Sequence, residues 1–385
     1  MTLITTTTDL AFLCDRLRAE PFVTIDTEFM RDRTFWPKLC LVQIAGAEEA
    51  VAIDPLASGI DLAPLLDLMA DPAVLKVFHA ARQDLEIFVR LMGKAPAPIF
   101  DTQIAAMVCG FGEEVAYDTL VAQVAKARID KTSRFTDWAR RPLTDAQLRY
   151  ALGDVTHLRV VYQGLIDRLE QTGRVDWVVQ EMADLTDPAL YAQEPDQAWR
   201  RLKVRSREPR FLAVVQALAA WREREAQRRD LPRNRIMRDD LLLEVAASRP
   251  KTAEDVARLP RLGLDARSCQ AVASVVTEAL ALPPESLPRL PEPVRPPRGI
   301  GPLVELLRVL LKLQAEEHNV AQRLIATSGD LELIAQDDGA DVPALAGWRR
   351  ELFGEAALSL KHGRLGFAVR GGKVRLLPLP ETEAA

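Results

Sequence analysis

The segment FVTIDTEFM, residues 22–30, has the composition of a buried β-strand but carries two acidic residues in its middle. Residues two apart on a strand point to the same face, so Asp26 and Glu28 are expected to lie side by side. Two unpaired carboxylates in a protein core are costly, and such a strand needs a compensating positive charge. The source of that charge therefore decides what this segment does.

Basic side chains of the same strand do not supply the charge, because Thr24 and Met30 occupy the neighbouring positions on the face of Asp26 and Glu28. A hard divalent cation such as Mg²⁺ would serve, since it takes oxygen ligands and keeps several waters. A cation at this strand would need further carboxylates from elsewhere in the chain.

The sequence around this strand predicts an α/β domain. Short runs of β-branched and aromatic residues, bounded by Pro, Gly or Asp, predict further strands at residues 39–46, 50–55 and 74–80. The first three strands follow one another closely enough for an antiparallel meander. Helical periodicity predicts helices at residues 82–93, 101–111 and 118–129, and a longer one from Thr144, where Thr144 and Gln147 match a capping box. We expect this mixed strand and helix domain to span residues 1–195.

Two positions could supply the further carboxylates. Asp84 falls in the first turn of the predicted helix 82–93, where an acid that interacts with the helix dipole is a common alternative. Asp154 follows Tyr150 by one helical turn, so the phenol and the carboxylate share one face. A solvated acid beside a partly buried tyrosine is the alternative there. Each position taken alone favours the purely structural interpretation.

Taken together, these residues resemble the DEDD exonuclease superfamily: D-x-E in a first strand, Asp at the start of a later helix, then Y-x-x-x-D, whose tyrosine marks the DEDDy branch. The surrounding stretches TIDTEFMRDRTFWPKLCLVQIA, VFHAARQDLEIF, FDTQIAAMVCG and YALGDVTHL look like the bacterial ribonuclease D family. The resemblance implies an RNase H-like fold. It also implies metal ligands at Asp26, Glu28, Asp84 and Asp154, with Tyr150 orienting the attacking water.

The activity that this resemblance implies is metal-dependent 3′→5′ exoribonuclease activity that releases 5′-monophosphate nucleotides from RNA, as in the 3′ maturation of tRNA precursors. Phosphodiester hydrolysis can use two cations roughly 3.5–4 Å apart, and we expect two Mg²⁺ or Mn²⁺ ions here. The pKa of tyrosine, near 10, makes Tyr150 a poor base at neutral pH.

The second half of the chain reads almost entirely as helix. Residues 231–246 and 320–335 resemble each other without gaps at an offset of 89, which predicts two copies of a small helical domain. Each copy looks like the HRDC domain that follows the nuclease in the ribonuclease D family. We place the two all-α HRDC-like domains at residues 205–285 and 301–378, joined by a stiff proline-rich linker at residues 286–300.

Charge is distributed unevenly along the chain. The formal net charge is -5, yet residues 199–238 hold thirteen Arg or Lys against four Asp or Glu. Trp199 and Trp221 are interleaved with these basic residues. A solvated face is one interpretation, but the imbalance favours contact with the phosphates of RNA.

The four cysteines lie far apart with no C-x-x-C pair, and the four histidines have no H-x-x-x-H spacing, so neither a disulfide framework nor an imidazole-bound metal is expected. We see no basic, apolar N-terminal signal and no stretch of the roughly 18 apolar residues that a membrane span requires. These features predict a cytoplasmic protein that needs neither a membrane nor an obligate protein partner.

Several residues near the predicted site favour structural roles. We interpret Asp101 as a helix N-cap, His79 as a hydrogen-bonded structural residue, and Asp54 as the end of a strand before a turn. Phe29, Phe35 and Trp36 could stack on a terminal base, but aromatic residues beside a strand more often belong to the core, and we expect them there.

Other functions that share part of the pattern are a DNA-directed 3′→5′ exonuclease of Werner or proofreading type and a nucleic-acid binding module with an inactive nuclease domain. The presence of all five site residues argues against the inactive module. A helicase is excluded by the missing phosphate-loop motif.

Overall fold

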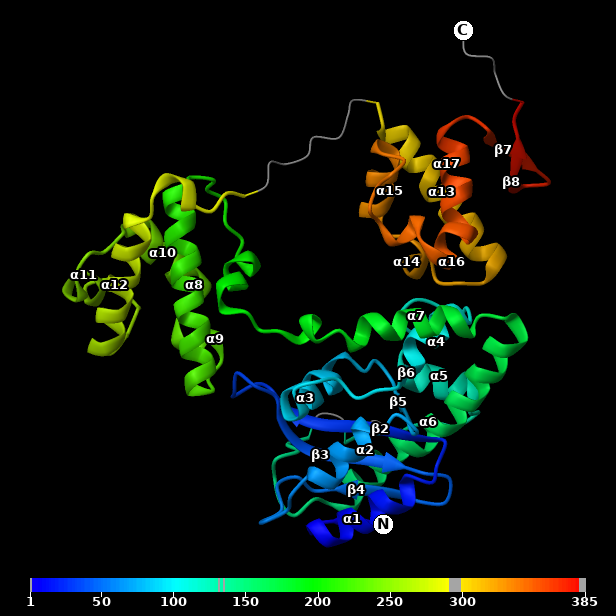
Figure 1. Ribbon diagram of the computed structural model, residues 1–385, viewed down its shortest axis with the longest axis horizontal. Helices are drawn as coiled ribbons and strands as arrows, with labels where there is room; N and C mark the ends of the chain where they lie inside the picture. Colours follow the sequence, from blue (N-terminus) through cyan, green and yellow to red (C-terminus); the bar gives the residue numbers. More distant parts are fainter. Residues whose placement is uncertain (1, 131, 134–135, 291–298, 381–385) are drawn as a thin grey trace.

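The computed structural model describes residues 2–130, 132–133, 136–290 and 299–380. It contains an N-terminal domain with a mixed sheet, followed by two helical domains that both lie on the same side of it (Figure 1). Each of the three parts has its own cluster of buried apolar side chains. Within the described ranges, none of the helices is both long and apolar enough to cross a membrane.

The N-terminal sheet has six strands in the order β1-β4-β3-β2-β5-β6. The strands are β1 (Thr2–Ile4), β2 (Phe22–Met30), β3 (Lys38–Ala45), β4 (Ala50–Ile53), β5 (Leu75–Phe78) and β6 (Ile99–Asp101). Strands β2, β3 and β4 form the predicted antiparallel meander, while β5 runs parallel to β2. The segment that opened the sequence analysis is therefore a central strand of a mixed sheet, as predicted.

Helices cover both faces of this sheet. They are α1 (Thr7–Leu17), α2 (Ala63–Ala70), α3 (Arg82–Met92), α4 (Thr102–Val108), α5 (Tyr117–Val124), α6 (Asp145–Thr172) and α7 (Val175–Thr186). The Thr24 hydroxyl donates to the Val155 carbonyl of α6, and the Thr27 hydroxyl donates to Asp84 of α3. Because residues three apart on a strand point to opposite faces, α6 and α3 lie on opposite sides of β2.

The long helix α6 begins where the sequence predicts. Thr144 is its N-cap, and the reciprocal bonds of the Thr144–Gln147 capping box are both present. The segment before the helix is held by Arg141, whose guanidinium donates two hydrogen bonds of 2.7 Å to the buried Asp54 carboxylate. Asp54 does end a strand as expected, but it also anchors the entry to α6.

The two helical domains repeat one structural unit. The first contains α8 (Pro209–Arg229), α9 (Arg233–Ile236), α10 (Asp239–Ser248), α11 (Ala253–Ala257) and α12 (Ala266–Ala281). The second contains α13 (Gly301–His318), α14 (Gln322–Ile325), α15 (Ser328–Gln336), α16 (Gly347–Arg349) and α17 (Glu355–Lys361). Helix α9 starts and ends 89 residues before α14, and α10 starts 89 residues before α15. The offset of 89 residues between the two similar sequence blocks is therefore also the offset between corresponding helices of the two domains.

Some elements differ from the sequence expectations. Strands β1 and β6 are only three residues long, too short to show an alternating pattern. The C-terminal part also contains a hairpin, β7 (Leu365–Arg370) and β8 (Lys373–Pro378), where the sequence suggested almost only helix. Residues 291–298 of the predicted proline-rich linker lie outside the described residues.

Candidate active site

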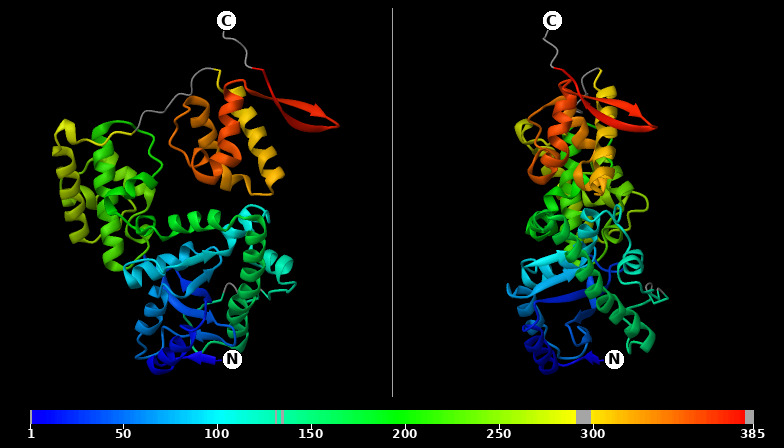
Figure 2. Two further views of the ribbon diagram at one scale, coloured as in Figure 1. Left: turned by 45° about the vertical axis from the view of Figure 1, so that its right-hand side comes forward. Right: turned by 90° about the vertical axis from the view of Figure 1, so that its right-hand side faces the viewer.

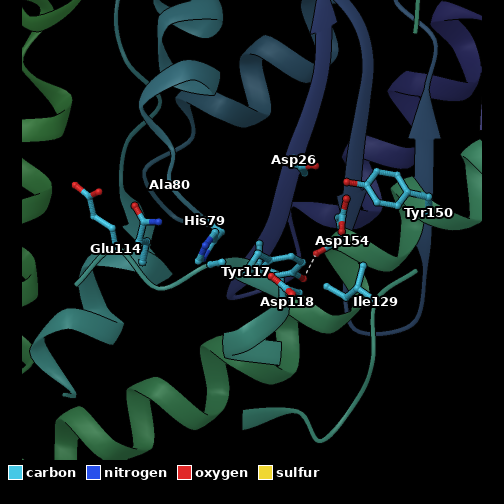
Figure 3. Close-up of a pocket in the computed structure, with 12 residues that line it drawn as sticks. Asp26, His79, Ala80, Glu114, Tyr117, Asp118, Ile129, Tyr150 and Asp154 are labelled. Atoms are coloured by element: carbon cyan, nitrogen blue, oxygen red, sulfur yellow. Dashed lines mark hydrogen bonds between the residues drawn. The ribbon is translucent and has the colours of Figure 1, made fainter. Parts of the chain in front are cut away.

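The centre of the candidate site is a group of three carboxylates. Asp26 and Glu28 come from β2 and Asp154 comes from α6, and each offers an oxygen such that these atoms all lie within 4.8 Å of one another. Figure 3 shows Asp26 and Asp154 directed toward the same space. Strand alternation places the first two on one face of β2, and the packing of α6 on that face adds the third.

Two hydrogen bonds fix α6 at this point, one from β2 and one from α5. The Thr24 hydroxyl, on the same face of β2 as Asp26, donates to the Val155 carbonyl at 2.8 Å. The Tyr117 hydroxyl donates to the backbone carbonyl of Asp154 (Figure 3). The position of the Asp154 carboxylate relative to Asp26 is thus set from both sides of the helix.

Asp84 lies in the first turn of α3, as predicted, but outside the group of three. Its side chain is 6% exposed, and it accepts a hydrogen bond from the Thr27 hydroxyl. Burial and the neighbouring charge of Asp26 raise the pKa of Asp84 well above its usual range. The two carboxylates are therefore close enough to repel each other.

The electrostatics of the site fit a bound cation. Burial raises the pKa of Asp26 to about 6, and only a backbone hydrogen bond from Thr27 opposes that shift. Carboxylates that repel each other in a desolvated site are stabilised when a positive charge binds between them. All the donors are oxygens, which suits a hard divalent cation such as Mg²⁺ or Mn²⁺.

Tyr150 lies one turn before Asp154 on α6, and its hydroxyl hydrogen-bonds the Asp154 side chain. Figure 3 shows the hydroxyl directed toward Asp154 and Asp26. Burial and the nearby charges of Asp154 and Glu28 raise the pKa of Tyr150 above its ordinary value. The phenol therefore remains protonated and acts as a hydrogen-bond donor, not as a base.

A cavity of about 400 Å³ opens beside the carboxylates. Its lining residues come from β2, the β5–α3 turn, α4, the α4–α5 loop, α5, the segment between α5 and α6, and α6. They are Asp26, His79, Ala80, Gln103, Glu114, Ala116, Tyr117, Asp118, Ile129, Tyr150, Asp154 and Leu158. Sequence reasoning identified the acidic end of this cavity but not the end formed by Gln103, Glu114 and Tyr117. Those residues lie in or next to loops, where no periodic pattern marks them.

Gln43 is a further residue that the sequence did not reveal. It pairs with Asp26 across β2 and β3, so the two side chains share a face of the sheet. Gln43 is fully buried, and neither its amide nitrogen nor its amide oxygen has a hydrogen-bond partner among the described residues. Only the register of β2 against β3 identifies Gln43 as a neighbour of Asp26, and that register cannot be read from the sequence.

Asp101 and His79, for which the sequence favoured structural roles, both make structural hydrogen bonds. Asp101 caps α4 through the Gln103 amide at 2.7 Å and also accepts from the backbone of the β5–α3 turn. The His79 ring hydrogen-bonds Thr102 at 2.9 Å, although it also lines the cavity. Burial lowers the pKa of His79, so the ring is held in its neutral form.

The basic segment 199–238 is partly neutralised by ion pairs. Its paired arginines and their acidic partners are Arg201 and Arg233 with Glu223, Arg222 with Asp239, Arg224 with Asp196, Arg228 and Arg229 with Glu225, and Arg238 with Asp240. Arg200, Lys203 and Arg205 are exposed and enter none of the ion pairs found within the described ranges. The charge imbalance read from the sequence therefore overstates the free positive charge.

Phe35 and Trp36 pack between domains rather than in the core. Their rings contact each other edge to face at 4.7 Å. Arg233 of the first helical domain stacks on Phe35, and Arg90 of α3 stacks on Trp36 at 3.8 Å. The Trp36 amide also donates to Asp230 at 3.0 Å, so these aromatics join the first helical domain to the sheet domain.

Comparison with known proteins agrees with this geometry. A family model described as 3'-5' exonuclease matches residues 1–170, and one described as HRDC domain matches residues 211–268. The chain is 52% identical to Ribonuclease D of Gluconacetobacter diazotrophicus, covering 98% of this chain and 96% of that one. It is 53% identical to Ribonuclease D of Acidiphilium cryptum, covering 98% and 97%. Among solved structures it is similar to Escherichia coli RNase D, an exoribonuclease involved in structured RNA processing, with a TM-score of 0.80, 31% identity and coverage of 94% and 99%.

Proposed function

Because the chain belongs to the ribonuclease D family of 3′→5′ exoribonucleases, we propose that it removes nucleotides from the 3′ ends of structured RNA, including tRNA precursors, with two divalent cations bound at its carboxylates. The observation that carries the proposal is the convergence of Asp26, Glu28 and Asp154 beside a nucleotide-sized cavity.

The carboxylates divide into two ligand groups that share Asp26. Asp26, Glu28 and Asp154 would hold one cation, and Asp26 with Asp84 would hold the other. Two cations bound there would supply an activated water and stabilise the leaving oxygen during phosphodiester hydrolysis. Mg²⁺ and Mn²⁺ both suit an all-oxygen ligand set.

The side chains of this chain orient the reactants. Tyr150, held protonated and hydrogen-bonded to Asp154, would orient the water that attacks the terminal phosphodiester. The cavity between Tyr150 and Glu114 would receive the terminal nucleoside. Asp154 and Tyr150 lie on one helix that is bonded to β2, so the water-orienting group and the ligands move together.

Features outside the site support RNA as the substrate. Arg200, Lys203 and Arg205 are exposed in the segment that leads into the first helical domain and can contact phosphates of the RNA body.

All four cysteines are buried free thiols, which supports a reducing compartment such as the cytoplasm.

The test uses one RNA and one DNA of the same sequence, each labelled separately at the 3′ and the 5′ end, with Mg²⁺ or Mn²⁺. The proposal predicts immediate release of labelled 5′-monophosphate from 3′-labelled RNA and a descending ladder from 5′-labelled RNA. EDTA should stop both reactions. Faster cleavage of the DNA would replace the proposal with the Werner or proofreading type of exonuclease, and release from the 5′ end would contradict it.

A further inference from the structure

The loop between α4 and α5 lines the nucleotide cavity and is held by the second helical domain. The Ala321 amide donates to the Met107 carbonyl at the end of α4, at 3.0 Å. The Arg323 amide donates to Glu113 at 3.2 Å, and the Arg323 guanidinium pairs with Glu114 at 2.5 Å. Glu114 is itself a cavity residue, at the opposite end of the labelled side chains from Tyr150 (Figure 3).

The backbone of this loop has a conformation that needs support. Glu114 has a φ of 45°, in the left-handed region that residues with a side chain rarely adopt. Gly110 has a φ of +79°, and a Cβ at Gly110 would lie 2.3 Å from the Asn319 side chain. Strained backbone persists where the surroundings determine it. The surroundings here belong to the second helical domain.

The second helical domain is anchored away from the cavity, on α7. Trp348 stacks on Trp177 with ring centroids 4.3 Å apart and an angle of 8° between the rings. Arg349 pairs with Glu181 at 2.7 Å, with both side chains at most 15% exposed. An exposed pair such as Arg323–Glu114 stabilises little alone. The anchor on α7 therefore provides the stability, and Arg323 links the domain to the loop. Figure 2 shows the second helical domain, coloured yellow-orange to red, next to the green helix α7.

The first helical domain provides an internal comparison. Its Asp230 corresponds to Asn319 at the offset of 89, and both residues end their helices in the left-handed conformation. Asp230 contacts Trp36 in the β2–β3 loop, which does not line the cavity. The same corner of the repeat thus docks twice, but only the second copy reaches the active site.

We propose that the second helical domain, residues 301–380, forms part of the active site by holding the α4–α5 loop, with Arg323 as a positioning residue for Glu114. The inference rests on the proposed function, because it assigns the cavity to the terminal nucleotide. It predicts that undocking this domain slows hydrolysis of a dinucleotide, which is too short to need RNA contacts elsewhere.

The test measures kcat and KM of the full-length chain on a 5′-phosphorylated diribonucleotide. Arg323→Ala should lower kcat about threefold to tenfold, since small displacements of groups that position a substrate slow the reaction strongly. Glu181→Arg and Arg349→Glu should each lower it by about tenfold or more. The double variant should recover most of the activity, which shows that the loss came from undocking. A Glu-specific protease should cut the 113–114 loop faster in each impaired variant.

Asp230→Gly, which removes the equivalent contact of the first helical domain, is the matched control and should leave the kcat on the dinucleotide unchanged. Wild-type kcat for Arg323→Ala on the dinucleotide would overturn the proposal, whatever its effect on long RNA. Failure of the proposed function is separate, because it appears in the wild-type enzyme as absence of RNA hydrolysis. Proteolysis of the 113–114 loop needs no activity, so unchanged cleavage of that loop in Glu181→Arg would overturn the docking even in that case.

Discussion

Asp26 is the residue on which the site depends, since it belongs to both groups of carboxylates. Its side chain shares a strand face with Glu28, approaches Asp154 from α6 and raises the pKa of Asp84. In the metal-free protein the charges of Asp26 and Asp84 repel each other, which raises the pKa of Asp84. Stability is thus sacrificed here for ligand placement, as is common at functional sites.

This conflict predicts a stability gain for Asp26→Asn. The pKa of Asp26 is about 6 in the folded chain against an ordinary value of 3.8, so the folded state binds more protons between these pH values. Stability from this group is therefore lost as pH rises through about 6, and the amide avoids that loss. We expect the metal-free variant to be more stable at pH 7 by about 1–3 kcal/mol, with no advantage near pH 4.

Chemical denaturation of the metal-free proteins at both pH values measures this difference. Asp167→Asn, at an exposed aspartate of α6, is the control and should change stability little. The variant should also lose hydrolysis while keeping RNA affinity. A metal-free Asp26→Asn protein that unfolds more easily than wild type at pH 7 would show that the carboxylates do not repel each other as described.

At the scale of elements, the site depends on how α6 lies on β2. The sequence showed that Tyr150 and Asp154 share a helix face, because their spacing is one turn, and it located the capping box at Thr144. It could not show that the Thr24 hydroxyl bonds the Val155 carbonyl, because that contact joins residues far apart in the chain. Helix periodicity reports a face, whereas the position of that face on a sheet is set by packing.

Thr24→Val tests this contact while keeping the size of the side chain. Loss of one buried hydrogen bond should reduce stability by about 1 kcal/mol. A shift of α6 should lower kcat by about tenfold through misplacement of Asp154. Thr277→Val, at an exposed position whose hydroxyl bonds a carbonyl within α12, is the control and should change neither stability nor kcat much. Kinetic constants and melting curves for both variants decide whether α6 placement matters for catalysis; equal kcat values would show that it does not.

The same limit of sequence reasoning applies to the loops and to the pairing of strands in the sheet. Gln43 became a neighbour of Asp26 only through strand register, and Glu114 entered the cavity only through loop packing against Arg323. The proposed ligands on β2 and α6 were recognisable because their spacing follows element geometry: Asp26 and Glu28 are two apart in a strand, and Tyr150 and Asp154 are four apart in a helix. Residues brought together by tertiary structure leave no such spacing.

At the scale of the whole molecule, the two helical domains divide their work. The first carries the exposed basic side chains near its N-terminal end, and the second holds a wall of the cavity. The count of basic residues in segment 199–238 did not reveal that acids outside that segment, Asp196, Asp239 and Asp240, neutralise some of them. RNA affinity should therefore depend on a few arginines and lysines.

Replacing Arg200, Lys203 and Arg205 together by Gln should weaken binding of structured RNA. If all three contact phosphates, the slope of log affinity against log salt should fall by about 2. Turnover of a dinucleotide should not change. The matched control replaces the ion-paired Arg224, Arg228 and Arg238 by Gln, and its salt slope should change less. Equal salt slopes for the two triple variants would refute this assignment of the RNA contacts.

The central claim is that the carboxylates on β2 and α6 hold the cations that hydrolysis requires. Its most direct test is the single-turnover rate on 3′-labelled RNA at increasing Mg²⁺ for wild type and Asp154→Asn. The claim predicts that Asp154→Asn lowers this rate by about a thousandfold or more and that saturating Mg²⁺ does not restore it. RNA affinity should be unchanged. An Asp154→Asn enzyme that reaches the wild-type rate at saturating Mg²⁺ would contradict it.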